Sequence, residues 1–106
     1  MRILDTSLAG VHLVEPEVHR DGRGEFWRSF CRRELHEAGV AFDIRQTNMS
    51  VNPAMHTLRG FHFQFPPSTE KKILTVVTGA AHVVIVDVRQ GSRTFLGYEA
   101  FELGVG

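Results

Sequence analysis

Short strand-like segments separated by turn residues constrain the fold of this chain more than any other feature. Some are apolar runs and others alternate apolar with polar residues, and they cover residues 11–14, 25–30, 44–51, 57–64, 73–77, 81–88 and 98–103. Clusters of Gly, Pro, Asn and Ser separate them, as expected for turns. Short strands at this spacing predict an all-β sandwich or barrel.

One helix is predicted, over residues 31–38, with Gly39 as its C-terminal stop. We expect this helix to pack against the sheets. The final segment, YEAFELGVG, stops just after a predicted strand. An all-β fold needs further strands to cover such an edge, so we expect either a partner chain there or an incomplete fold.

Length and composition set broad limits on the class of protein. A chain of 106 residues fits a single domain over 1–106, and 42% hydrophobic with 23% charged residues is typical of a globular domain. Twelve basic and 12 acidic side chains cancel, so net charge favours neither nucleic acid nor an anionic membrane as a partner. The lone Cys31, with no signal peptide and no long apolar run, predicts a cytoplasmic protein.

The stretch LRGFHFQFPPSTEKK concentrates titratable groups around two prolines. If its flanking strands form a hairpin centred on Pro67, Gln64 faces Glu70 and His62 faces Lys72. Cβ atoms of opposed residues lie roughly 5 Å apart. This register therefore predicts a base and an ammonium group sharing one small space.

Gly60 lies between Arg59 and His62, and a glycine inside a strand often marks a bulge that turns both neighbours to one side. A histidine beside a cation keeps a lowered pKa and stays available as a base. The ammonium of Lys72 is suited to stabilising an enolate oxygen, and an arginine fork is suited to phosphate. Such a set of groups could carry out proton abstraction next to a ketone, but the spacing alone does not select this function.

Other interpretations of the same residues stay open. His62 could be a hydrogen-bonded histidine of a barrel, and the adjacent lysines could protect a strand edge from aggregation. Barrels of the cupin type often bind metal through His-x-His and a later glutamate. Here the pattern is His62-Phe63-Gln64 with Glu70, and glutamine is a poor transition-metal ligand. We therefore predict no metal.

Two further polar patterns have both a functional and a plain interpretation. Arg23 lies in a glycine-flanked turn, where it either presents its guanidinium to a phosphate or is simply solvated. Gln46, Asn48 and Ser50 alternate along a predicted strand and share one face. That face is either a solvated exterior or the wall of a binding cavity.

The order and spacing of several motifs extend this interpretation over nearly the whole chain. The motifs are Asp21-x-Arg23-Gly24-x-Phe26, Gln46-x-Asn48-x-Ser50, Leu58-Arg59-Gly60-Phe61-His62-Phe63-Gln64, Lys72-Ile73-Leu74 with Gly79, Val86-Asp87-Val88-Arg89 and Ser92-x-Thr94-Phe95. Taken together, they resemble the dTDP-4-dehydrorhamnose 3,5-epimerase family. The resemblance implies a cupin-type jelly-roll β-barrel or sandwich with one short helix.

The resemblance also implies an activity: epimerisation at C3 and C5 of a dTDP-linked 4-keto-6-deoxy sugar, without a metal or an organic cofactor. His62 would be the general base, and Lys72 would stabilise the enolate. The nucleotide and its diphosphate would be held by Arg23, Phe26, Gln46, Asn48 and Arg59. Members of the family are typically homodimers that exchange strands, which would cover part of the open edge.

The chain departs from the family pattern in three respects. Members continue with further strands that carry a tyrosine acid and an aspartate that orients the histidine, and this chain stops before both. Arg28 stands where glutamate is usual, and His82 where aspartate is common. Without an acid, a base alone could exchange protons and yet fail to invert a carbon centre. The alternative function is therefore a non-catalytic sugar-nucleotide binding or assembly module.

Overall fold

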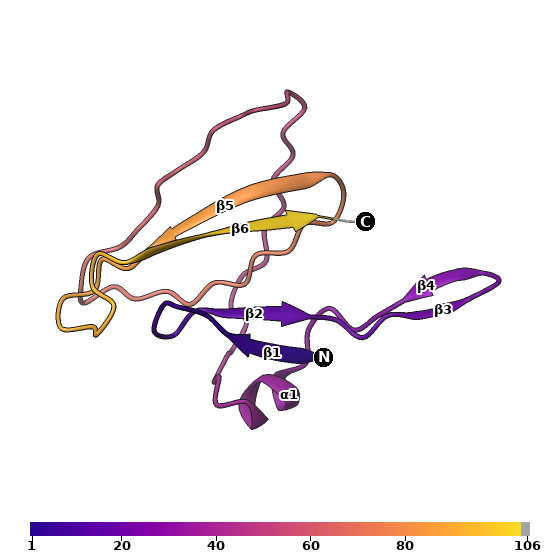
Figure 1. Cartoon of the computed structure of the whole chain (residues 1–106), viewed down its shortest axis with the longest axis horizontal. Coiled ribbons are helices and arrows are strands. Elements are labelled where there is room, and N and C mark those ends of the chain that lie inside the picture. Colours follow the sequence, from indigo (N-terminus) through magenta and orange to yellow (C-terminus); the bar gives the residue numbers. More distant parts are fainter. Residues whose placement is uncertain (105–106) are drawn as a thin grey trace.

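The computed structural model describes residues 1–104, which form three antiparallel two-stranded sheets and one short helix (Figure 1). The elements in chain order are β1 (Arg2–Asp5), β2 (His12–Glu15), β3 (His19–Asp21), β4 (Gly24–Phe26), α1 (Arg32–Glu37), β5 (Ala80–Val86) and β6 (Tyr98–Gly104). Each sheet is a pair of consecutive strands, β1 with β2, β3 with β4 and β5 with β6. Strand therefore predominates over helix, as the sequence predicted.

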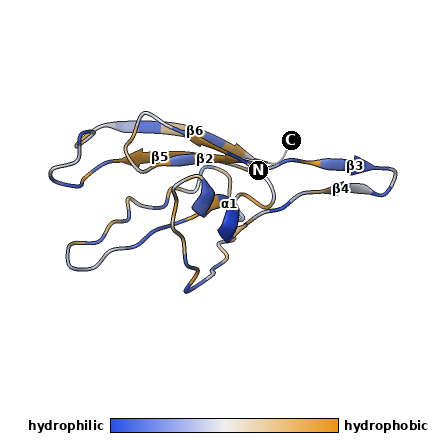
Figure 2. Cartoon of the chain, turned by 90° about the horizontal axis from the view of Figure 1, so that it is seen from below, coloured by the Kyte–Doolittle hydropathy of each residue, from blue (hydrophilic) through white to orange (hydrophobic). Residues whose placement is uncertain are grey.

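The longest sheet pairs β5 with β6, from Ala80 opposite Gly104 to Val86 opposite Tyr98. Most of β5 has the colour of hydrophobic residues in Figure 2, whereas β3 has the colour of hydrophilic ones. The predicted strands over 81–88 and 98–103 are confirmed, with shifts of one or two residues at their ends. The predicted strand over 11–14 is confirmed as β2, and the one over 25–30 only as far as Phe26 in β4.

The core of the described part is small, and its buried hydrophobic side chains are Leu8 and Leu35. Leu8 lies in the turn between β1 and β2 and packs under the turn that leads into β6. A Cβ atom added at Gly97 would lie 3.3 Å from Leu8 Cδ2 and only 2.9 Å from the carbonyl oxygen of Thr94. Glycine at position 97 thus allows two distant turns to meet.

The predicted strands over 44–51, 57–64 and 73–77 are not formed in this structure. Residues 41–79 run as a long loop-like trace between α1 and β5 (Figure 1). Their backbones make one hydrogen bond to each other in the described chain, from Ser68 N to Phe65 O at 3.0 Å. The strand prediction was wrong here because a strand requires a neighbouring strand as its hydrogen-bonding partner, and residues 1–104 supply none to this segment.

Helix α1 begins and ends within one residue of the predicted range. Leu35 points into the core, which explains why this short helix is held in place. Gly39 adopts φ +85°, and its N–H donates to the carbonyl of His36 at 2.9 Å. The left-handed conformation at this position is the usual glycine stop. No helix in residues 1–104 has the length and apolar character needed to cross a membrane.

The first turn of α1 is tied to the start of the chain through Glu34. Its carboxylate accepts a hydrogen bond from the Met1 amino group at 3.0 Å and another from Arg28 Nη1 at 3.1 Å. The Met1 ammonium group first, and Arg28 second, lower the pKa of Glu34 to about 2. Arg28 therefore has a structural partner in this chain.

The pKa of Glu34 predicts acid sensitivity. A carboxyl with a folded-state pKa of about 2 and an ordinary value of 4.5 stabilises the fold fully above the ordinary value, and this contribution is lost as pH falls toward 2. In thermal melts across this range, we expect Glu34→Gln to lie below the wild type at neutral pH and to converge with it near pH 2. Glu37→Gln, which removes only an exposed 3.9 Å ion pair with Arg33, is the control. A gap for Glu34→Gln that stays constant down to the lowest pH would contradict this role.

Candidate functional site

The structure places the predicted site residues in two separate regions. The hairpin β3–β4 projects from the body, whereas the 41–79 segment loops out elsewhere, and Figures 1 and 2 agree on this separation. The hairpin carries Arg23 and Phe26, and the segment carries Gln46, Asn48, Arg59, His62 and Lys72. Within one copy of the chain, these two sets of residues are therefore not brought together.

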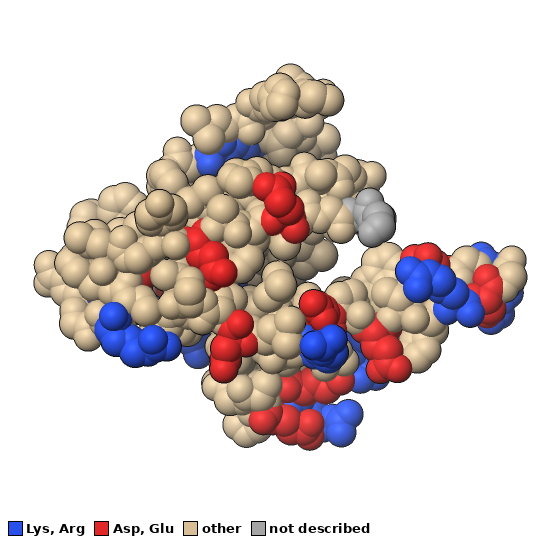
Figure 3. Space-filling model, in the orientation of Figure 1, with Lys and Arg blue, Asp and Glu red and all other residues tan. Residues whose placement is uncertain are grey.

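Arg23 is held in its turn by Asp21. Its Nη2 donates to Asp21 Oδ2 at 2.6 Å, its Nε donates to the same oxygen at 3.2 Å, and its backbone N–H donates to Oδ1 at 2.8 Å. Arg23 thereby lowers the pKa of Asp21. Figure 3 shows acidic and basic side chains gathered over this projecting hairpin. The guanidinium is oriented by Asp21 but exposed, and its Nη1 makes no hydrogen bond within residues 1–104.

Arg59 joins two parts of the 41–79 segment. Its Nη1 donates to Ser50 Oγ at 2.8 Å and to Asn52 Oδ1 at 3.2 Å. Asn52 Nδ2 also donates to Ser50 Oγ, at 3.2 Å. These bonds hold the end of the polar run that contains Gln46 and Asn48 next to the arginine, so the predicted binding wall and Arg59 belong to one region.

Glu70 bridges the two sides of the proline turn. Gln64 Nε2 donates to Glu70 Oε2 at 3.1 Å, and Lys72 Nζ lies 3.1 Å from Glu70 Oε1. The predicted proximity of Gln64 and Glu70 is therefore confirmed. Lys72 reaches Glu70, and no hydrogen bond between Lys72 and His62 is formed in the described chain. Because no strand ladder forms here within residues 1–104, no backbone hydrogen bonds hold His62 opposite Lys72.

Gly60 breaks the regular backbone path at the predicted position. It has φ +108°, a backbone conformation that residues with a Cβ atom rarely adopt. A Cβ atom added there would lie 3.4 Å from His62 Cδ2 and 3.7 Å from its Nε2. The imidazole of His62 therefore lies back over Gly60, and it is exposed to solvent. A ring in this position can accept a proton from a small molecule.

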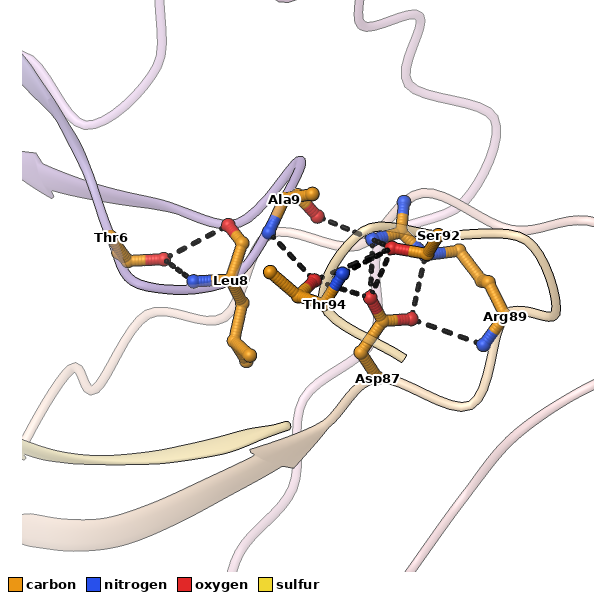
Figure 4. Close-up of polar contacts among 7 residues, drawn as sticks. All are labelled: Thr6, Leu8, Ala9, Asp87, Arg89, Ser92 and Thr94. Carbon is orange, nitrogen blue, oxygen red and sulfur yellow. Dashed lines mark hydrogen bonds and ion pairs between the residues drawn. The ribbon is translucent and has the colours of Figure 1, made fainter. Parts of the chain in front are cut away.

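A buried polar cluster lies outside this region, around Asp87 (Figure 4). The carboxylate accepts bonds from Ser92 Oγ and Thr94 Oγ1, both at 2.6 Å, and from Arg89 N, Nε and Nη2 at 3.0, 2.9 and 3.0 Å. Arg89 first, followed by the two hydroxyls, holds the pKa of Asp87 far below its usual range. A carboxylate so fully engaged is not a base for catalysis.

The Asp87 cluster instead connects the two main hairpins. Thr94 Oγ1 accepts a hydrogen bond from Ala9 N at 3.1 Å, and Arg89 Nη2 donates to the carbonyl of Ala9 (Figure 4). Ala9 lies in the turn between β1 and β2, so the cluster holds that turn against the loop between β5 and β6. The sequence motifs around Asp87 contributed to the family resemblance, but they gave no indication of this structural role.

His82 also has a partner in the structure. It lies directly opposite Glu102 in the β5–β6 register, and its Nδ1 contacts Glu102 Oε1. Both side chains are exposed. His82 therefore forms a cross-strand pair on an outer face. In residues 1–104, no group of three or more His, Cys, Asp or Glu side chains is placed to hold a metal ion.

Comparisons with known proteins agree on one relationship. The family model described as dTDP-4-dehydrorhamnose 3,5-epimerase matches residues 5–105. The dTDP-4-dehydrorhamnose 3,5-epimerase of Mycolicibacterium smegmatis is 41% identical over 101 residues, covering 94% of this chain and 50% of its own length. The enzyme of the same name from Streptomyces griseus is 38% identical over 98 residues, covering 92% of this chain and 48% of its own.

A solved structure extends the comparison to the backbone. The crystal structure of dTDP-4-dehydrorhamnose 3,5-epimerase from Bacillus anthracis, described with TDP and PPi bound, matches with a TM-score of 0.92 and 34% identity. The match covers 97% of this chain and 59% of that one. The chain thus spans about half the length of the curated relatives that it matches.

Proposed function

Because the chain belongs to the dTDP-4-dehydrorhamnose 3,5-epimerase family, we propose that it acts in the epimerisation at C3 and C5 of a dTDP-linked 4-keto-6-deoxy sugar. The observation that carries this proposal is the family match over residues 5–105, which includes both His62 and Lys72. Neither a metal nor an organic cofactor has a part in the proposed reaction.

The proposed chemistry begins with His62 as a base. Its imidazole takes the proton from the carbon next to the ketone, and the electron pair of the broken C–H bond moves onto the carbonyl oxygen as an enolate. The ammonium of Lys72 stabilises that negative oxygen. An acid on the opposite face then gives a proton to the carbon, which restores the ketone and inverts the carbon. The chain has a single tyrosine, Tyr98, which lies in β6 and not in the 41–79 segment. We therefore assign the acid to no residue of the described chain.

The nucleotide part of the substrate would be held by the remaining predicted residues. Arg59 is already oriented by Ser50 and Asn52, and an oriented guanidinium binds a diphosphate with less loss of side-chain entropy. Arg23 is likewise oriented by Asp21 and keeps Nη1 available. Phe26 is exposed and can stack on a base. Gln46 and Asn48 would supply hydrogen bonds from the polar run.

We also propose a homodimer with strand exchange. The β3–β4 hairpin projects away from the 41–79 segment of its own chain, so Arg23 and Phe26 would complete the site of a second copy. The finer fold proposed is a cupin-type jelly roll, with further strands pairing along the 41–79 segment. Cys31 is a free thiol, which fits the reducing cytoplasm as the proposed location.

Solvent exchange tests the proposed proton abstraction at C3 and C5 directly. The full chain is incubated with the 4-keto sugar nucleotide in deuterated water, and deuterium at C3 and C5 is measured by NMR and mass spectrometry. We expect incorporation at both carbons. If neither carbon gains deuterium while dTDP still binds in calorimetry, the chain is the non-catalytic binding module. If dTDP fails to bind at all, both functions are wrong.

A further inference from the structure

Glu70 is a residue of the 41–79 segment to which the proposed reaction gives no role. One oxygen of its carboxylate, Oε1, lies 3.1 Å from Lys72 Nζ, and the other, Oε2, accepts a hydrogen bond from Gln64 Nε2 at 3.1 Å. The side chains of Glu70 and Lys72 are 45% and 60% exposed. An ion pair so open to water contributes little to stability. The consequence of this contact is therefore the position that it gives to the ammonium group.

The proline turn brings Glu70 and Gln64 together. Ser68 N donates to the carbonyl of Phe65 at 3.0 Å, which closes the turn through the backbone. The hydrogen bond from Gln64 to Glu70 joins the chain on either side of this turn. A side chain held at one end loses rotamer freedom. Gln64 thus braces the carboxylate that receives the lysine.

The two adjacent lysines have different partners. Lys71 Nζ donates to the carbonyl of Ala41 at 2.7 Å, at the start of the segment, whereas Lys72 Nζ pairs with Glu70. Neighbouring side chains of an extended chain point to opposite sides, which accounts for the separate partners. Within residues 1–104, the Glu70 carboxylate forms its ion pair with Lys72 and none with Lys71.

A lysine ammonium on a flexible four-carbon stem needs a partner to occupy one place. A group that stabilises an enolate is effective when it is aimed at that oxygen before the reaction begins. Glu70 restricts Lys72 in advance, so less side-chain entropy is lost when the oxygen forms. The ammonium has three N–H donors. It can therefore keep its contact with Glu70 and donate to the enolate oxygen at the same time.

We propose that Glu70, braced by Gln64, is a positioning residue that holds the Lys72 ammonium for the enolate oxygen. Glu70 acts through the lysine and does not touch the reacting atoms. The inference rests on the proposed function for the role of Lys72. The contact between the two side chains, in contrast, can be tested without any catalytic activity.

The first test observes the lysine side chains of the full chain by NMR, without substrate. Lys71 and Lys72 are the only lysines in the sequence, so isotope-labelled lysine gives two sets of signals, which Lys71→Arg assigns. Glu70→Met should shift the Lys72 Cε and Nζ signals and make that side chain more mobile, while the Lys71 signals stay. Glu37→Met, which removes an exposed carboxylate in α1, should change neither lysine. Equal mobility of Lys72 in the wild type and in Glu70→Met would overturn the proposal.

The second test measures deuterium exchange at C3 and C5 of the 4-keto sugar nucleotide. Glu70→Met should lower kcat by about tenfold and leave KM nearly unchanged, because the nucleotide contacts remain. Glu70→Gln keeps an oxygen acceptor and should recover part of the loss. Adding Glu70→Met to Lys72→Met should have no further effect, because a positioning residue acts only through its lysine.

An equal loss of kcat with and without Lys72 would overturn the proposal. A wild-type chain that shows no exchange would overturn the proposed function instead. The NMR comparison would then still decide whether Glu70 holds Lys72, so the two failures are distinguishable.

Discussion

Replacement of His62 by asparagine is expected to lower the rate of deuterium incorporation at C3 and C5 by about 10²–10⁴-fold, the usual contribution of a general base. Asparagine is similar in size and polarity but cannot accept the proton. The imidazole of His62 is solvent-exposed and lies over Gly60, so its loss removes little packing. Affinity for dTDP, measured by calorimetry, should stay near that of the wild type.

His56 provides a matched control in the same segment. It is also exposed, and its φ of +64° is one that asparagine adopts more readily than most residues. His56→Asn should therefore keep both the fold and the exchange rate. If both variants lose exchange equally, the effect reflects the segment as a whole and not a base at position 62. If His62→Asn keeps the wild-type rate, another group removes the proton.

The strand predictions succeeded where the partner strand is close in sequence. The apolar run over 81–88 and the alternating run over 98–103 pair with each other as β5 and β6. The predicted strands over 44–51, 57–64 and 73–77 form no ladder within residues 1–104. Alternation predicts which face a residue takes, but it contains no information on whether a partner is present. Whether the 41–79 segment forms strands therefore depends on a partner strand, which alternation cannot predict.

Two strands escaped prediction because they are short and polar. β3 is His19–Asp21, which contains no apolar residue, and β1 is Arg2–Asp5, with only Ile3 and Leu4 apolar. The turn between β3 and β4 was nevertheless predicted from its glycines, and in the structure Gly24 has φ +133°, a value that glycine tolerates. In this hairpin the turn, and not hydrophobic burial, determines the pairing.

The candidate site was predictable only in part, for a similar reason. The assumed hairpin register, centred on Pro67, predicted that Gln64 faces Glu70. In the structure the side chains of these two residues are joined by a hydrogen bond. The same register predicted that His62 faces Lys72, but the lysine is long and reaches Glu70. The role of Asp87 could not be predicted, because its donors lie in a loop whose path no periodicity describes. The sequence signal available for this role was a polar residue, Asp87, directly after the apolar run of β5.

Asp87→Asn is expected to cause the largest loss of stability among polar substitutions in this chain. The carboxylate accepts bonds from Arg89, Ser92 and Thr94 and is buried. An amide in its place presents N–H groups to these donors, so buried polar groups lose their partners. We expect the unfolding midpoint to fall on the order of 10 °C. Asp43→Asn, which removes exposed 3.7 Å ion pairs, should change it little.

Hydrogen exchange and pH locate the effect of Asp87 within the fold. Leu96 N donates to the Asp87 carbonyl at 2.7 Å, and Ala9 N donates to Thr94 Oγ1 at 3.1 Å. Both amides should exchange faster in Asp87→Asn, because the two turns separate.

The folded-state pKa of Asp87 is depressed, so its stabilisation of the fold is complete above the ordinary value of 3.8 and is lost only as pH falls below that value. The gap between wild type and variant should therefore stay constant from neutral pH down to about that value and narrow in stronger acid. A gap that is absent at neutral pH would show that the cluster does not hold the turns together.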